Sequence, residues 1–141
     1  MRRKFAVAAA VVVAALPATA FGATVSVDVI GGVTYTAAPG ELNVVELSEL
    51  AGTVSITDTG AVINAGNGCN QVSAHEVTCS GVTHNPGIRL GDLGDTASLV
   101  AADSAFFTLV GQGGKDHLTL CAHCHGLLVG DSGGDSFKAG T

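Results

Sequence analysis

Positively charged residues are scarce in this chain of 141 residues. It has six Lys and Arg against twelve Asp and Glu, and three of the six lie among the first four residues. Only Arg89, Lys115 and Lys138 follow, whereas all twelve acids lie after residue 20, so three positive and twelve negative charges give the rest of the chain a net charge of −9. We expect no nucleic acid and no anionic lipid surface as partners, because both require a positive patch. A chain of this sign favours cations instead.

Tryptophan is absent, tyrosine occurs once and methionine occurs once, at the first position, whereas glycine occurs twenty times. The remaining composition is dominated by small and β-branched residues. This composition is typical of short strands joined by tight turns and is unlike that of a helical bundle. We therefore predict an all-β fold.

Long hydrophobic runs are missing after the first twenty residues. The chain begins MRRKFAVAAAVVVAALPATA, which predicts a signal peptide over residues 1–20 with cleavage after Ala20. The uncharged run from Phe5 is shorter than the roughly 20 residues that a membrane-spanning helix needs. The R-R-K-F start weakly resembles a twin-arginine signal, so the export route stays open. We expect a secreted, extracellular protein with no membrane span after signal removal.

Residues 21–89 alternate β-branched and polar side chains in short segments that glycine-rich turns separate about every ten residues. The pattern predicts an N-terminal antiparallel β module. One segment, NVVELSEL at residues 43–50, could instead form a short amphipathic helix, but its β-branched pair and its neighbours favour a strand. Cys69 and Cys79 flank a hairpin-like excursion, and we expect them to form a disulfide in an exported protein.

Glutamate disappears after Arg89, and all six acids from Asp92 onward are aspartates. Two segments, residues 95–116 and 116–135, align as strand, loop, strand and a glycine-rich turn that ends in aspartate. Their steps are 21 and 19 residues. A repeat of this size is typical of a solenoid whose coils stack on one another. We predict that residues 90–141 form a short parallel β-roll.

Two glycine-rich turns match the nonapeptide G-G-x-G-x-D-x-U-x. They are GQGGKDHLT at residues 111–119 and GDSGGDSFK at residues 130–138, which depart from the pattern at Gln112 and Asp131. Here the chain resembles the repeats-in-toxin (RTX, or hemolysin-type) calcium-binding proteins, whose repeats form a parallel β-roll. The upstream segments, among them TVSITDTGA, EVTCSGV and LGDLGDT, resemble the β module that precedes such repeats in secreted actinobacterial-type RTX proteins.

The resemblance implies that calcium lies between stacked turns and is shared by their aspartates and carbonyls. Calcium takes about six to eight oxygen ligands, and glycine lets carbonyls converge without a clashing side chain. We expect stacking to place Asp95 over Asp116 and Asp116 over Asp135, with a roll that is loose without the cation and ordered with it. The turn before Asp95 departs from the pattern at Leu93. The implied metal-site residues are Asp95, Gly111, Gly114, Asp116, Gly130, Asp131, Gly133 and Asp135.

The hexapeptide CAHCHG at residues 121–126 admits three interpretations. Cys121 and Cys124 can form a disulfide in an exposed loop, or they can bind a soft metal such as zinc together with His123 and His125. The third interpretation, and the alternative function for the chain, is c-type haem linkage in an electron-transfer protein, because C-x-x-C-H is its signature. No recognisable spacing supplies a second axial haem ligand.

Catalytic motifs are missing. No G-x-S-x-G nucleophile elbow is present, and GDSGG at residues 130–134 resembles chymotrypsin-like serine proteases over only five residues that also fit the repeat. We expect the protein not to be an enzyme. The hypothesis from the sequence is a structural or surface module that binds calcium outside the cell.

Overall fold

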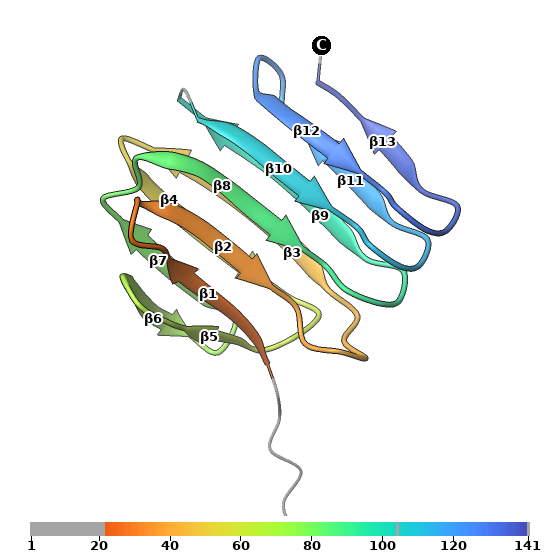
Figure 1. Cartoon of the computed structure of the whole chain (residues 1–141), viewed down its shortest axis with the longest axis horizontal. Coiled ribbons are helices and arrows are strands. Elements are labelled where there is room, and N and C mark those ends of the chain that lie inside the picture. The colour runs from red at the N-terminus through yellow and green to blue at the C-terminus, as the bar shows by residue number, and fades with distance from the viewer. Residues whose placement is uncertain (1–21, 104, 141) are drawn as a thin grey trace, which may run out of the picture.

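Two β-sheets make up the part of the chain that the computed structural model describes, residues 22–103 and 105–140 (Figure 1). The thirteen strands are β1 (Ala23–Val27), β2 (Gly32–Thr36), β3 (Val44–Leu50), β4 (Thr53–Asp58), β5 (Ile63–Ala65), β6 (Cys69–Ser73), β7 (Glu76–Ser80), β8 (His84–Arg89), β9 (Thr96–Ala102), β10 (Phe106–Val110), β11 (His117–Leu120), β12 (His125–Val129) and β13 (Ser136–Lys138). The described residues contain no helix, which confirms the all-β prediction, and so none that could cross a membrane.

The strands are divided between a six-stranded sheet, in the order β12-β10-β8-β2-β1-β5, and a seven-stranded sheet, in the order β13-β11-β9-β3-β4-β7-β6. From β8 onward, consecutive strands alternate between the two sheets, and each strand pairs in parallel with the strand two places further along the chain. In the seven-stranded sheet, Thr96 is the register partner of His117, and His117 is the partner of Ser136. These partners are separated by the same 21 and 19 residues as the sequence repeat.

The N-terminal region is mixed, and not purely antiparallel as predicted. The pairs β1–β2, β3–β4, β4–β7 and β6–β7 are antiparallel, but β1–β5 and β2–β8 are parallel. The parallel pairs arise because the chain leaves the six-stranded sheet for the other sheet and returns twice, as β5 in the direction of β1 and as β8 in the direction of β2. Alternating hydrophobicity does not distinguish such a crossover from a hairpin.

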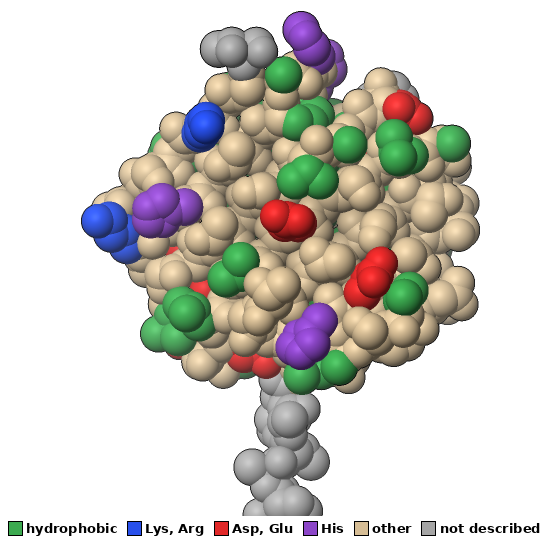
Figure 2. All heavy atoms as spheres, turned by 180° about the vertical axis from the view of Figure 1, so that it is seen from behind, with side chains coloured by type: hydrophobic (Ala, Val, Ile, Leu, Met, Phe, Trp, Pro, Cys, Tyr) green, Lys and Arg blue, Asp and Glu red, His purple; other side chains and the backbone are tan. Residues whose placement is uncertain are grey.

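Side chains from both sheets fill the space between them. Along β3, Val45 and Leu47 are fully buried, whereas Val44 and Glu46 are exposed. A period of two is that of a strand, so the strand prediction for residues 43–50 is confirmed and the helical alternative is wrong. On the rear of the molecule, exposed hydrophobic side chains occur in small separate groups (Figure 2).

One hydrophobic cluster runs through both predicted regions. It contains Tyr35 and Ile56 from the first region and Phe107 and Leu118 from the second. The parallel pairs β2–β8 and β3–β9 also connect the two regions. The predicted division of the chain into two domains at residue 89 therefore stays a prediction. The predicted signal peptide, residues 1–20, lies outside the described residues.

All four cysteines form disulfides. Cys69 and Cys79 are direct register partners on β6 and β7, which confirms their predicted pairing. Cys121 pairs with Cys124 in the loop between β11 and β12. This second disulfide is the first of the three interpretations of CAHCHG.

Candidate functional site

Three turns of one shape lie side by side at one end of the two sheets (Figure 1). We call them the Gly/Asp turns; they join β8 to β9, β10 to β11 and β12 to β13 and comprise residues 90–95, 111–116 and 130–135. The second residue of each turn has a left-handed φ, which is 93° at Gly91, 73° at Gln112 and 65° at Asp131. Gln112 and Asp131, which replace the second glycine of the nonapeptide, therefore adopt the left-handed conformation that glycine has at Gly91.

The fourth residue of each turn also has a positive φ, at 88° for Leu93, 134° for Gly114 and 137° for Gly133. A Cβ atom on Gly114 would overlap the carbonyl oxygen of Leu93, and one on Gly133 would overlap that of Gly114. In these two turns, the Cα of the fourth residue therefore packs against a carbonyl oxygen of the preceding turn. Stacking alone requires these two glycines, whether or not a metal is bound.

Backbone hydrogen bonds hold neighbouring turns together. The N–H of Gly113 donates to the carbonyl of Gly91 (2.8 Å), and the N–H of Ser132 donates to the carbonyl of Gln112 (2.8 Å). In the opposite direction, the N–H of Gly114 donates to the carbonyl of Ser132 (2.9 Å). These bonds fix the turns in register, so the residues that end each turn are also aligned.

The aspartates that end the turns, Asp95, Asp116 and Asp135, form a ladder that we call the aspartate column. The backbone N–H of Asp95 donates to Oδ1 of Asp116 (2.8 Å), and the N–H of Asp116 donates to Oδ1 of Asp135 (3.0 Å). Oδ1 of Asp95 accepts a bond from the N–H of Asn43 (2.8 Å). The structure therefore brings the three aspartates together in the order that the repeat predicts.

The second carboxylate oxygen of the column is not satisfied. Asp95 and Asp116 are completely buried, and the Oδ2 atom of each has no hydrogen-bond partner. The pKa of Asp95 is raised to about 6, mainly by burial. The backbone N–H of Asn43 acts in the opposite direction, and the negative charges of Asp116, Asp58 and Asp92 contribute to the rise. A buried carboxylate oxygen without a donor or a counter-charge is costly.

The first glycine of two turns makes room for these carboxylates. A Cβ atom on Gly111 would overlap Oδ2 of Asp116, and one on Gly130 would overlap Oδ2 of Asp135. Asp131, in contrast, is exposed on the surface of its turn and lies outside the column. Of the predicted site residues, the column and its first-position glycines form one group, and Gly114 and Gly133 shape the turns around it.

A buried polar network that the sequence interpretation missed continues the column into the N-terminal region. Nδ2 of Asn43 donates to the hydroxyl of Tyr35 (2.9 Å) and to Oδ2 of Asp58 (2.9 Å), and that hydroxyl also donates to Oδ2 of Asp58 (2.7 Å). Oδ1 of Asn43 is buried without a partner, as are the Oδ2 atoms of Asp95 and Asp116. Asn43 directly precedes β3, just as Asp95 directly precedes β9. This shared position before a strand is the sequence feature from which the network could have been predicted.

The chemistry of the column suits a hard cation. Its unpartnered atoms are all oxygens, which are the ligands of calcium, whereas soft metals prefer sulfur and nitrogen. Within the described ranges, no group of three or more His, Cys, Asp or Glu side chains is arranged to hold a metal ion. The carboxylates of the column would therefore need backbone carbonyls of the turns to complete a coordination shell, and each carbonyl has a second lone pair to offer.

The CAHCHG loop lies at the other end of the sheets, between β11 and β12 (Figure 1). Its two sulfurs are joined to each other in the Cys121–Cys124 disulfide. Covalent haem attachment would need both sulfurs for bonds to the porphyrin. The geometry therefore gives the haem alternative no support.

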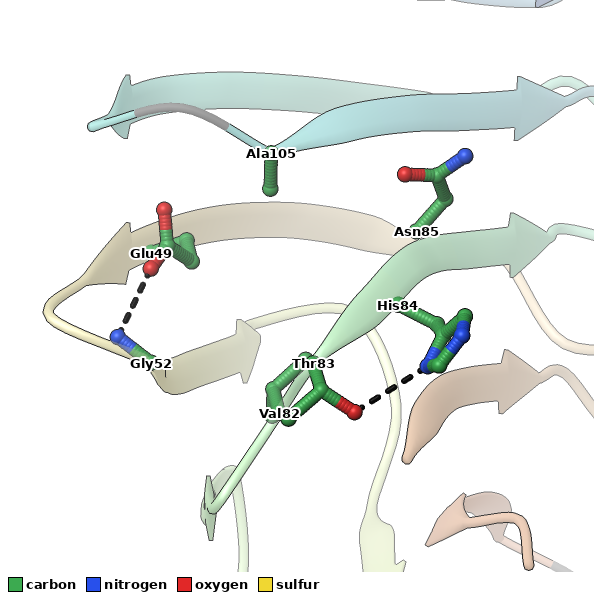
Figure 3. Close-up of a pocket in the computed structure, with 7 residues that line it drawn as sticks. All are labelled: Glu49, Gly52, Val82, Thr83, His84, Asn85 and Ala105. Carbon is green, nitrogen blue, oxygen red and sulfur yellow. Dashed lines mark hydrogen bonds between the residues drawn. The ribbon is translucent and has the colours of Figure 1, made fainter. Parts of the chain in front are cut away.

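A polar pocket of about 240 Å³ also lies at this other end (Figure 3). Its buried acid, Glu49, is fully paired, because Oε1 accepts the N–H of Gly52 (2.9 Å) and Oε2 accepts the N–H of Asp103 (3.2 Å). On the far side of the pocket, the Thr83 hydroxyl lies 3.0 Å from Nδ1 of His84. Glu49 connects two loops, and neither of its oxygens lacks a hydrogen-bond partner.

Comparisons with models of protein families, with curated proteins and with solved structures find no match.

Proposed function

We propose that the aspartate column binds calcium, and that the protein is an extracellular structural or surface module ordered by this ion. The single observation that carries the proposal is the pair of completely buried, unpartnered Oδ2 atoms on Asp95 and Asp116. A divalent cation would supply the positive charge that these neighbouring carboxylates lack. Asp116 and Asp135 would form the second step of the same column.

The spacing of β-strands supports this ligand. Equivalent residues on adjacent strands lie roughly 4.8 Å apart, which is about twice the calcium–oxygen distance of 2.3 to 2.6 Å. One ion between neighbouring turns can therefore contact oxygens from both. The smaller magnesium ion, with ligands at about 2.0 to 2.1 Å and a rigid octahedral preference, suits this spacing less well.

We also interpret β8 to β13 as coils of a degenerate RTX-like β-roll. Three observations support this interpretation. Consecutive strands alternate between the sheets, the strands within each sheet pair in parallel, and positive φ angles recur at the same positions of the Gly/Asp turns. In that interpretation, Leu118 and Phe137 open the strands that follow the two nonapeptide turns. Leu118 is buried in the core, whereas Phe137 is exposed on the edge strand β13.

Calorimetric titration of the metal-free protein with calcium chloride tests the proposal. We expect saturable binding with a Kd of about 10⁻⁴ to 10⁻³ M, the range of extracellular modules, together with a gain of β signal in circular dichroism. No heat and no spectral change up to roughly 10 mM calcium, well above that range, would contradict it.

Asp116→Asn is the decisive variant. The amide oxygen can still accept the bond from the N–H of Asp95, so the ladder is kept while the charge is removed. We expect calcium affinity to fall at least about tenfold, because even substitutions of groups that only support a metal ligand cost about that much. Asp103→Asn removes the same charge from an exposed residue at the other end of the sheets and serves as the matched control. Equal affinities of the two variants would show that the column is not the site.

A further inference from the structure

The two disulfides of the protein differ in position and in surroundings. The Cys69–Cys79 disulfide joins register partners on β6 and β7, and Cys79 is completely buried in the hydrophobic core. Cys69, Cys121 and Cys124 are all half-buried. The first disulfide is therefore fully shielded on its Cys79 side, whereas the second lies in a loop and neither of its cysteines is fully buried. Because exchange requires a thiolate to reach a sulfur atom, access favours reaction at the second disulfide.

The loop that carries Cys121 and Cys124 is held in place by contacts that do not depend on its disulfide. The N–H of Cys124 donates to the carbonyl of Cys121 (3.2 Å), and the N–H of Gly140 donates to the carbonyl of Leu120 (2.9 Å). The strand that follows the loop, β12, pairs along its whole length with β10. The two cysteines should therefore stay close together after reduction, ready to form the bond again.

Opening this disulfide also frees little of the chain. It spans a sequence separation of 3 residues, against 10 for Cys69–Cys79, and a short loop restricts the unfolded chain less. Reduction at this position should therefore leave the fold intact. A disulfide that can open without unfolding the protein can cycle.

Two exposed imidazoles accompany the half-buried Cys121–Cys124 disulfide. His123 lies between the cysteines with a left-handed φ of 63°, and His125 follows directly after Cys124. The loop stands at the top of Figure 1, and His125 begins β12 directly after it. Both histidines directly neighbour Cys124 in the sequence. A positively charged neighbour favours the thiolate, which is the reactive form of cysteine in exchange.

We propose that the Cys121–Cys124 pair is a thiol–disulfide exchange site for small-molecule or protein thiols. A substrate thiolate attacks one sulfur, the Cys121–Cys124 bond breaks, and a mixed disulfide forms while the other cysteine leaves as a thiolate and takes up a proton. A second thiolate attacks the mixed disulfide and releases the oxidised substrate. In total, two substrate thiols lose two electrons and two protons to the protein disulfide, and the reverse reaction oxidises the cysteines again.

Timed reduction with glutathione tests the proposal, with alkylation of the free thiols and peptide mass spectrometry as the readout. We expect Cys121 and Cys124 to be labelled at least about tenfold faster than Cys69 and Cys79, with an unchanged circular dichroism spectrum. The Cys69–Cys79 disulfide of the same chain is thus the internal control. Equal rates for the two disulfides, or labelling that occurs only together with loss of structure, would overturn the proposal.

Single-cysteine variants test the intermediate. With oxidised glutathione, Cys124→Ser should accumulate a glutathione mixed disulfide on Cys121: the Cys121 thiolate attacks the glutathione disulfide, one glutathione leaves as a thiol, and no second cysteine is present to resolve the product. The circular dichroism spectrum should show an intact fold. The absence of any mixed disulfide in a folded Cys124→Ser or Cys121→Ser protein would also contradict the site. The double variant His123→Gln/His125→Gln should slow the exchange near neutral pH, and an unchanged rate would overturn the part assigned to the imidazoles.

Discussion

The aspartate column at one end of the sheets and Glu49 at the other differ in how their buried carboxylates are paired. At one end, the three Gly/Asp turns stack in register, and Asp95 and Asp116 each keep one buried oxygen without a partner. At the other end, both oxygens of the buried Glu49 accept backbone N–H groups from neighbouring loops. Each oxygen of Glu49, which connects two loops, thus has a hydrogen-bond partner. In the column, by contrast, Asp95 and Asp116 on successive turns each keep one oxygen without a partner.

The two ends also differ in how far their sequences repeat. The Gly/Asp turns have positive φ angles at the same two positions, and two of them bring Cα close to a carbonyl of the preceding turn. The loops at the other end share no such motif, and CAHCHG occupies one of them. Repetition is confined to the end where stacking demands one backbone shape, and this is the end at which negative charge accumulates.

The largest expected effect comes from a methyl group inside the stacked turns. Gly114→Ala places Cβ on the carbonyl oxygen of Leu93 at a φ of 134°, so we expect a loss of about 4 kcal/mol or more in the free energy of unfolding. Gly81→Ala is the control at the other end, where φ is 72° but the space is open, and it should cost only about 1 kcal/mol. Urea denaturation measures both, and equal losses would mean that the turns are not closely stacked.

An additional charge next to the column should have the next largest effect. Asn43→Asp removes the donor to Asp58 and places a further carboxylate beside Asp58 and Asp95, so we expect a loss of about 3 kcal/mol without calcium. Millimolar calcium should recover part of this loss, because a more negative column binds the cation more strongly. Asn85→Asp, at an exposed position, adds the same charge and should change stability by less than about 0.5 kcal/mol. Matching losses in the two variants would show that Asn43 is not coupled to the column.

Acid should stabilise the metal-free protein, with a smaller effect. The pKa of Asp95 in the folded protein is about 6, above its ordinary value of 3.8. Between pH 3.8 and about pH 6, the folded protein therefore holds a proton on Asp95 that the unfolded chain has already released. Stability therefore falls as the pH rises through this window and stays at its lower level above it. We expect the denaturation midpoint in metal-free buffer to be higher at pH 5 than at pH 7, and calcium affinity to be lower. Asp95→Asn should lose this dependence, and a midpoint that fell on acidification in the wild type would contradict the shift.

Much of this arrangement was predictable, because its causes are local in the sequence. Alternation of buried and exposed residues predicted β3, and the repeat of glycine and aspartate predicted the order of the column. The Cys69–Cys79 disulfide followed from a hairpin between two nearby cysteines. In each case the residues that determine the feature lie within one strand or recur at a constant step.

Features that depend on how the chain crosses between sheets were not predictable. The parallel pairing of β1 with β5 joins segments about forty residues apart whose patterns suit a hairpin equally well. The network of Tyr35, Asn43 and Asp58 needs three side chains from separate strands and turns to meet in one buried place. Pairing of Cys121 with Cys124 was one of three chemically reasonable outcomes, since spacing alone suits haem, zinc and a disulfide.

The most direct test of the aspartate column is the thermal melting temperature of the wild-type protein in calcium compared with that in chelator. Calcium at about one hundred times its Kd stabilises a folded protein by about 2.7 kcal/mol, so we predict a rise of roughly 10 °C, and a clearly smaller rise with magnesium at the same concentration. A melting temperature that is the same in calcium and in chelator would contradict the account, because the buried oxygens of Asp95 and Asp116 would then have no cation to bind.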